Sequence, residues 1–245
     1  MDVLVDQPKS LLSLKRRLDE SGFAILRGFV SDGLLSNAEL QCQAACQQID
    51  VARRNESVYG VRYLLTASPE LRRFFSTPPF ADVMTGLLGP TAEPVMGMFF
   101  DKTADANWPI RWHQDVTIRV REVRYVPSGF EARAVKDGGS HLLPPISLLE
   151  QMLAIRVHLD DAPADHGALR VIPGSHRCGL LTAEAIDDQL AAVEVVTCDV
   201  RKGDVMLMRP LLLHASSRCK RPAHRRVAHI QYAAFELPGG LEWQG

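Results

Sequence analysis

The feature that most constrains the fold is a series of short β-rich runs that fills the chain from about residue 95 onward. Each run carries aliphatic, aromatic or β-branched residues and ends near glycine, proline or aspartate, which is typical of strands joined by turns. The runs are PVMGMFF, HQDVTIRV, MLAIRVHLDD, ALRVIPGS, AVEVVTCDV, DVMLMRPLLLHASS and RVAHIQYAAFEL. Such a series predicts a β-sandwich or a β-barrel.

The N-terminal third, about residues 1–94, differs because its apolar residues recur at helical spacing. Leucines among charged residues predict a helix over 10–21, and FAILRGFV then predicts a strand. Ser31 and Asp32 can cap a helix that runs to about residue 54, and SPELRRFFS and PFADVMTGLLG predict two short helices. We therefore expect a mainly β protein (α+β) with helices packed on the outside of the sheets.

No internal repeat, low-complexity tract or linker-like stretch divides the sequence, so we expect one domain over residues 1–245. Its β core would occupy about residues 95–237. Within the core, the segment 122–151 is marked by glycine and proline and interrupts the β-rich runs. A long insertion of this kind inside a compact domain is usually a lid or a binding loop, and we expect that role here.

Composition and charge argue against several classes of partner. The chain is 46% hydrophobic and 23% charged, as ordinary globular proteins are, and its net charge of −1 gives no reason to expect a nucleic acid or an anionic membrane. No apolar run approaches the ~20 residues needed to cross a bilayer, and the N-terminus lacks the apolar stretch of a secretory signal. The five cysteines are scattered, which favours buried thiols in a reducing compartment, so we expect a cytoplasmic protein.

Two His-x-Asp pairs are candidate metal ligands, His113-Gln114-Asp115 and His158-Leu159-Asp160. With 8 histidines and 17 aspartates in 245 residues, about half of one such pair is expected by chance, so the pattern alone is weak. Side chains two residues apart in a strand point to the same side and can share a metal ion. The first pair begins a β-like run, whereas the second leads into an acidic turn. We therefore favour the first pair as ligands and expect the second to be structural.

A third ligand is expected from His214, which ends the apolar run MLMRPLLL. Two histidines and one carboxylate form the facial triad of non-haem Fe(II) oxygenases, although zinc with a bound water fits the same ligands. An oxygenase that uses 2-oxoglutarate also needs a cation for the far carboxylate of that co-substrate, and arginine suits this role. Arg225 and Arg226 open the last β-rich run, and alternation along a strand turns only one of them inward.

The order of several segments resembles the phytanoyl-CoA dioxygenase family of Fe(II)/2-oxoglutarate oxygenases. These segments are HQD (113–115), LDDAPADHGALRVIPGSH (159–176), GDVMLMRPLLLHASS (203–217) and RRVAHIQY. SGFAILRGFVS is similar to the family's opening strand, so the resemblance covers about residues 21–235. It implies a double-stranded β-helix, which is a jelly-roll, cupin-like core. It also implies that His113, Asp115 and His214 bind iron.

The resemblance further implies how the co-substrate is held. Arg225 would anchor the 2-oxoglutarate carboxylate with help from the Ser216 hydroxyl, and Lys102 stands where family members often have a lysine near the co-substrate. Two departures follow the distal histidine. Ala215 replaces a common glycine, and the basic stretch 218–220 replaces a common asparagine. Neither departure involves a ligand.

The function we expect is therefore that of a dioxygenase that uses Fe(II), 2-oxoglutarate and O2. It would hydroxylate an unactivated C–H bond of a small molecule and release succinate and CO2. One alternative is a cupin-like metal-dependent hydrolase or isomerase, but hydrolysis needs no keto-acid anchor such as Arg225 with Ser216. The other is a non-catalytic module that binds a small molecule on the same fold, but such a module has no reason to keep an intact triad.

The substrate is expected to carry negative charge. If the strand that begins with the first His-x-Asp pair stays regular, Arg119 and Arg121 lie on its metal-facing side. A buried guanidinium is costly without an anionic partner. Its partner would be a protein carboxylate, solvent at the rim of the site or an anionic group of the substrate. Arg119 is expected nearer the metal and is therefore the candidate for binding a substrate carboxylate or phosphate, with Arg156 as a second cation. Arg121 would pair with a protein carboxylate such as Glu122 or Glu131.

Overall fold

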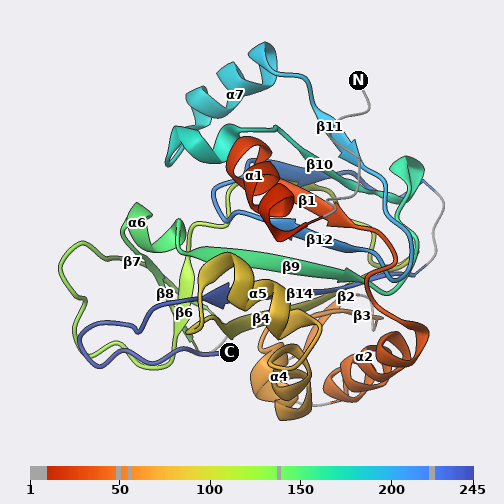
Figure 1. Ribbon diagram of the computed structural model, residues 1–245, viewed down its shortest axis with the longest axis horizontal. Coiled ribbons are helices and arrows are strands. Elements are labelled where there is room, and N and C mark those ends of the chain that lie inside the picture. Colours follow the sequence, from red (N-terminus) through yellow and green to blue (C-terminus); the bar gives the residue numbers. More distant parts are fainter. Residues whose placement is uncertain (1–9, 48–50, 55–56, 137–138, 221–223) are drawn as a thin grey trace.

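The computed structural model describes residues 10–47, 51–54, 57–136, 139–220 and 224–245. Its strands form three antiparallel sheets (Figure 1). The largest has seven strands in the order β1 (Phe23–Leu26), β12 (Val205–Met208), β9 (Met152–His158), β14 (Arg225–Ala233), β4 (Glu93–Lys102), β3 (Ser57–Val61) and β2 (Val51–Arg54). The second has the order β11 (Val196–Cys198), β10 (Leu169–Val171), β13 (His214–Ser216) and β5 (Ile110–His113). The third has the order β6 (Ile118–Val120), β8 (Gly139–Leu143) and β7 (Glu131–Lys136).

Helices from the N-terminal part pack on one face of the seven-stranded sheet (Figure 1). They are α1 (Leu11–Ser21), α2 (Asp32–Ala45), α3 (Leu64–Ala67), α4 (Pro69–Phe75) and α5 (Phe80–Leu88). Their apolar side chains form one buried cluster with alternate residues of the central strands, among them Ile155 of β9 and Ile230 of β14. The predicted mainly β fold with peripheral helices is confirmed, and the sheets do not close into a barrel.

The opposite, inner face of this sheet is polar where β4, β9 and β14 run side by side. Because successive residues of a strand alternate between its faces, the residues beside Ile155 and Ile230 point inward. The register pairs Arg225 with Lys102 and His229 with Arg156. All four side chains are buried. Further along the inner face, an apolar cluster fills the space between the two larger sheets.

Several expected elements differ from those observed. The helix expected to run to about residue 54 ends at Ala45, and β2 occupies Val51–Arg54. The run expected as one strand from His113 is broken, because β5 ends there and β6 belongs to the third sheet. DVMLMRPLLLHASS likewise forms two strands, β12 and β13, in different sheets. Two further helices, α6 (Ile146–Leu149) and α7 (Ala183–Ala192), were not anticipated.

The segment 122–151 is not an irregular loop as expected from its glycines and prolines. It contains β7, β8 and α6, and β8 pairs with both β6 and β7 in the third sheet. Its side chains Phe130, Leu142 and Leu143 belong to a second buried cluster. A lid role for this segment stays a prediction. None of the described helices has the length and apolar character of a membrane span.

Candidate metal centre

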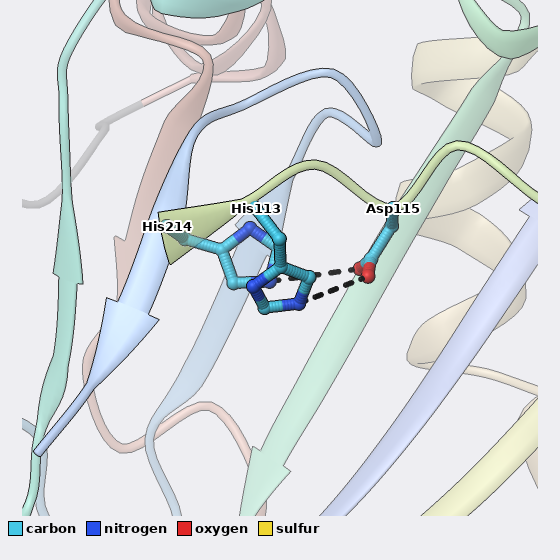
Figure 2. A group of neighbouring side chains, drawn as sticks. All are labelled: His113, Asp115 and His214. Atoms are coloured by element: carbon cyan, nitrogen blue, oxygen red, sulfur yellow. Dashed lines mark ion pairs between the residues drawn. The ribbon is translucent and has the colours of Figure 1, made fainter. Parts of the chain in front are cut away.

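The four-stranded sheet and the loop that follows β5 bring His113, Asp115 and His214 together (Figure 2). His113 ends β5 and His214 begins β13, and the two residues are direct partners in the register of this strand pair. Asp115 lies in the loop after β5 and turns its carboxylate toward both imidazoles. Its Oδ1 lies 3.7 Å from His113 Nε2, and its Oδ2 lies 3.8 Å from His214 Nε2. One ligand atom from each residue lies within 4.8 Å of the others, which is a spacing that one metal ion can bridge.

Hydrogen bonds prepare both histidines as ligands. The Nδ1 of His113 lies 2.8 Å from the carbonyl oxygen of Arg111, and the Nδ1 of His214 lies 2.8 Å from that of Leu212. A carbonyl oxygen only accepts, so each Nδ1 carries the hydrogen and donates it. Each Nε2 therefore keeps its lone pair and faces Asp115. This backbone contact on the far ring nitrogen is typical of metal-binding histidines, so the three residues fit a metal ion.

The surroundings keep His214 and Asp115 in the protonation states that metal binding needs. Burial lowers the pKa of His214 to about 4, although Asp115 opposes this shift. Burial alone would raise the pKa of the Asp115 carboxyl, but the neighbouring histidines, His214 first, outweigh burial and hold that pKa below its usual value. His214 is therefore neutral and Asp115 ionised near neutral pH. The side chain of His113 is 39% exposed, against 4% for His214, so the site opens on the His113 side.

Gln114, between the two ligands of the first pair, explains why the chain leaves the strand here. Its amide nitrogen donates to the carbonyl oxygens of Gly179 and Leu211 at 2.8 and 2.7 Å. Its amide oxygen accepts from the N–H of Leu181 at 2.9 Å. These three bonds tie the loop to two other segments. The expectation that Asp115 sits in a regular strand is wrong. Asp115 lies in a loop, and the hydrogen bonds of Gln114 hold this loop against the rest of the protein.

The residues expected at the co-substrate lie on the polar inner face of the large sheet and on β13. Lys102 is fully buried, and its Nζ donates to Ser216 Oγ at 2.9 Å and to the carbonyl oxygen of Ser217 at 3.0 Å. Arg225 is 3% exposed and donates to the carbonyl oxygen of Gly167, while its Nε has no hydrogen-bond partner among the residues that the structure describes. In the described part of the chain, neither cation forms an ion pair. Two buried cations without a carboxylate form a site for an anion.

Burial also shifts the pKa values of this cationic pair. It lowers the pKa of Lys102 to about 7, with further lowering by the charge of Arg225. It lowers the pKa of Arg225 to about 10, with further lowering by Arg156. These shifts arise in part from repulsion between neighbouring positive charges, and this repulsion is relieved when an anion binds.

Arg226 follows Arg225 in β14 and therefore points to the opposite face of the sheet. Its guanidinium donates to both carboxylate oxygens of Asp160 at 2.7 and 2.8 Å and to Glu39 at 3.2 Å. Asp160 thus binds an arginine, and the structure does not bring the second His-x-Asp pair together with His214. His158 belongs to a strand, as the β-rich run MLAIRVHLDD predicts, and not to the turn that follows. It ends β9 on the inner face, buried, and both its ring nitrogens are without a hydrogen-bond partner among the described residues.

Sequence reasoning missed His229. Its Nε2 lies 3.8 Å from Asp115 Oδ2, and its Nδ1 lies 3.0 Å from Arg156 Nη1. Burial, together with the charge of Arg156, lowers its pKa to about 3. The signal was present in the sequence, because His229 stands four residues after Arg225 and therefore on the same face of the strand. Arg156, predicted to contact the substrate, is 6% exposed and lies beside this centre.

The argument that placed Arg119 beside the metal is wrong, because it required one regular strand from His113. Arg119 lies on β6, where its guanidinium stacks 4.4 Å from the centroid of the Tyr63 ring and donates to the carbonyl oxygen of Arg62. A contact between Arg119 and the substrate stays a prediction. Arg121 does pair with a carboxylate, but its partner is Glu242 at 3.6 Å instead of the residues expected.

Comparisons with known proteins agree with this geometry. No curated protein matches the chain significantly. The structure of EctD from S. alaskensis with 2-oxoglutarate and 5-hydroxyectoine is similar, with a TM-score of 0.71 and 21% identity over 96% of this chain and 81% of EctD. The epimerase SnoN in complex with Fe3+, alpha ketoglutarate and nogalamycin RO has a TM-score of 0.67 and 17% identity over 96% of this chain and 92% of SnoN. AviO1 from Streptomyces viridochromogenes Tue57 has a TM-score of 0.65 and 19% identity over 94% of this chain and 96% of AviO1.

These structures confirm the predicted cupin-like fold. Residues 18–227 match the family described as phytanoyl-CoA dioxygenase (PhyH). The match covers most of the 245 residues. The chain therefore belongs to the phytanoyl-CoA dioxygenase family and, with it, to the Fe(II)/2-oxoglutarate-dependent oxygenases.

Proposed function

We propose that this protein is a 2-oxoglutarate-dependent dioxygenase that hydroxylates a C–H bond of a small anionic molecule. The observation that carries the proposal is the combination of two sites in one fold. The triad of His113, Asp115 and His214 fits a metal ion. Lys102 and Arg225 supply buried positive charge, and their hydrogen bonds in the described residues go to a hydroxyl and to carbonyl oxygens instead of a carboxylate.

The metal ion proposed at the triad is Fe(II). Two neutral imidazoles and one carboxylate are the ligand set of non-haem Fe(II) oxygenases, and they leave coordination positions open for other ligands. Iron with 2-oxoglutarate and O2 supplies the oxidising power for an unactivated C–H bond, and succinate and CO2 are released. The chain's own residues hold the three ligand side chains in place, through the pairing of β5 with β13 and the hydrogen bonds of Gln114.

The co-substrate proposed for the cationic site is 2-oxoglutarate. Arg225 and Lys102 would bind its far carboxylate, and the Ser216 hydroxyl, which already accepts from Lys102 at 2.9 Å, would complete the contact. Arginine binds a carboxylate through two parallel N–H groups, which fixes orientation as well as position. A zinc hydrolase has no use for such a site, so the buried cations favour the oxygenase over that alternative.

The substrate is proposed to be anionic because of a third buried cation. Arg156 lies on the same inner face and, among the described residues, forms no ion pair. Before any ligand binds, Arg156, Arg225 and the partly protonated Lys102 thus lie on one face of the sheet, and the Asp115 carboxylate lies near Arg156. Positive charge from the metal ion adds to the charge of these cations. A 2-oxoglutarate dianion would neutralise only part of this positive charge. A carboxylate or phosphate on the substrate would neutralise the remaining positive charge.

The proposed outcome of the reaction is hydroxylation. Solved structures of this fold are described with different reactions. EctD is crystallised with 5-hydroxyectoine, SnoN is described as an epimerase and SnoK as a carbocyclase. The fold alone does not choose among these outcomes.

We also propose that the protein acts in the cytoplasm.

A turnover screen tests the proposal. The protein is loaded with Fe(II), supplied with 2-oxoglutarate and O2, and incubated with small carboxylates, phosphates and neutral compounds of matched size. We expect succinate to form and O2 to be consumed, with stimulation by anionic compounds and a product heavier by one oxygen atom. Succinate formation that no compound stimulates, or stimulation by neutral compounds alone, would contradict the substrate class. Tight binding of a compound without any 2-oxoglutarate turnover would instead favour a binding module.

A further inference from the structure

A third histidine lies as close to the metal-binding carboxylate as the ligands do. The Nε2 of His229 is 3.8 Å from Asp115 Oδ2, and the Nε2 of His214 is also 3.8 Å from that oxygen. His229 is 1% exposed, so it faces the interior of the fold. By its distance to Asp115 it is a candidate fourth metal ligand, although the group of ligand atoms within 4.8 Å of one another does not include it.

The hydrogen bond from Arg156 argues against that role. Its Nη1 lies 3.0 Å from His229 Nδ1. A guanidinium group only donates hydrogen bonds, so Nδ1 must accept and cannot carry a hydrogen in this contact. The hydrogen of the neutral ring is therefore on Nε2, the atom that faces Asp115. His113 and His214 have the opposite arrangement, because carbonyl oxygens hold the hydrogen on Nδ1.

Strand register keeps this contact in place. Arg156 of β9 and His229 of β14 are direct partners across the antiparallel pair. Side chains at such positions stand side by side on one face of the sheet, with their Cβ atoms about 5 Å apart. The pair lies in the middle of the seven-stranded sheet, with β12 and β4 on either side. Arg156 therefore has little freedom to move away from His229.

We infer that His229 is a positioning residue for Asp115, and that Arg156 sets its tautomer. The Nε2–H of His229 is buried without a hydrogen-bond partner among the described residues, and Asp115 Oδ2 is the acceptor that faces it. A small rotation of the carboxylate brings the two atoms into hydrogen-bond distance. The backbone N–H of Asp115 donates to the carbonyl oxygen of Pro210 at 2.9 Å, but among the described residues no hydrogen bond holds its carboxylate. One carboxylate oxygen then serves the metal ion and the other accepts from His229.

This inference rests on the proposed metal site, and ¹⁵N NMR of the histidine side chains tests it. Spectra are recorded on the metal-free protein and on the Zn(II)-loaded protein, in which zinc is a diamagnetic probe. The signals of His229 are assigned by their loss in His229→Gln. We expect His229 to carry its hydrogen on Nε2 in both states, and His113 and His214 to bind zinc through Nε2. A hydrogen on Nδ1 of His229, or zinc binding by its Nε2, would overturn the inference.

The same spectra of Arg156→Met test the role assigned to the arginine. Methionine keeps an unbranched side chain but has no donor for Nδ1. We expect His229 to lose its preference for the Nε2–H tautomer in this variant. An unchanged tautomer in Arg156→Met would contradict the role of Arg156.

Metal affinity provides a second readout that a merely structural role would not produce. Glutamine at position 229 keeps an N–H donor near the place of Nε2, whereas leucine removes it. Loss of a hydrogen bond to a metal ligand typically weakens metal binding 10–100-fold. We expect His229→Leu to raise the Kd for Co(II) by about 10-fold or more, and His229→Gln to remain close to the wild type. Equal affinities of the two variants would contradict the inference.

Ile230→Val is the matched control, because Ile230 adjoins His229 but packs on the opposite face of β14. It should lower the melting temperature slightly and leave the Kd for Co(II) unchanged. If the wild-type protein binds no divalent metal, the proposed function fails. The tautomer of His229 in the metal-free protein still decides the present inference in that case.

Discussion

His113 and His214 stand directly opposite each other on β5 and β13, and the centroids of their imidazole rings lie 4.2 Å apart. Their sequence separation is large, yet the strand register fixes their distance before any metal binds. Backbone carbonyl oxygens on the far side of each ring also fix which nitrogen carries the hydrogen. The two histidines are therefore preorganised, and the Asp115 carboxylate completes the set from an adjoining loop.

The first prediction concerns the metal ligands. Replacing His113, Asp115 or His214 with alanine should each abolish tight binding of Fe(II), because two remaining ligands hold a divalent ion poorly. Asp160→Ala is the control, since Asp160 binds Arg226 and belongs to the His-x-Asp pair that the structure separates from His214. Metal content after gel filtration measures the result. Loss of iron in Asp160→Ala, with retention in Asp115→Ala, would mean that the wrong pair has been chosen.

The second prediction compares two adjacent arginines. Arg225→Met should weaken 2-oxoglutarate binding about 30-fold or more, because losing a buried charge-assisted pair typically costs about 2–5 kcal/mol. Iron binding should survive. Arg226→Ala should leave 2-oxoglutarate binding unchanged and lower the free energy of unfolding by about 1 kcal/mol, since its carboxylate partners lie near the surface. Calorimetric titration and urea unfolding measure the two effects, and the opposite ranking would move the anchor by one residue.

The third prediction follows from the pKa of Lys102, which burial lowers to about 7. Above that pH, the ammonium group loses its proton in the ligand-free protein. The affinity for 2-oxoglutarate should therefore fall as pH rises through about 7, and Lys102→Met should bind more weakly but with a flatter pH dependence. Titrations at several pH values measure this. Equal pH dependence in both proteins would show that Lys102 does not titrate in this range.

The same lowered pKa affects the stability of the ligand-free protein, and this is the fourth prediction. The unfolded chain holds the Lys102 proton up to the usual value of 10.5, whereas the folded chain releases it near 7. Between these values the unfolded state binds more protons, so Lys102 makes the folded protein more stable as pH rises. Urea unfolding of wild type and Lys102→Met across this window should show a steeper rise in stability for the wild type. A steeper rise in the variant would contradict the assignment.

The fifth prediction concerns Arg119, which stacks on Tyr63 and donates to the Arg62 carbonyl oxygen. These contacts predict that Arg119→Met lowers the melting temperature, because a stacked guanidinium contributes about 0.5–2 kcal/mol. The binding of 2-oxoglutarate by the folded variant should not change. An unchanged melting temperature, together with a higher KM for the substrate once one is known, would restore the substrate role predicted from the sequence.

The parts of the site that could be predicted from the sequence depend on local patterns. The first His-x-Asp pair, the histidine at the end of an apolar run and the two arginines that open β14 are each recognisable from neighbouring residues. Strand alternation turns only one of Arg225 and Arg226 inward, and the family resemblance identifies Arg225 as that residue. The mainly β class follows from the repeated short runs, since each must bury one face against another element.

The rest depends on contacts between distant segments. HQDVTIRV contains β-forming residues and neither glycine nor proline, and Asp115 alone is too weak a signal to locate the break after His113. Gln114 causes that break by bonding to segments 65 and 97 residues away. The contact between Arg156 and His229 likewise joins residues 73 positions apart and requires the register of β9 and β14. Neither relationship leaves a periodic signal.

The central claim is that the metal ion and 2-oxoglutarate occupy adjoining sites in this fold. Anaerobic titration of the Fe(II)-loaded protein with 2-oxoglutarate tests it most directly, because a keto-acid that chelates Fe(II) produces a weak charge-transfer band in visible light. We predict that this band grows and saturates at one equivalent of 2-oxoglutarate, that Arg225→Met needs a much higher concentration to reach it, and that Asp160→Ala behaves as the wild type does. Absence of the band in a wild-type protein that has bound one equivalent of Fe(II) would contradict the account.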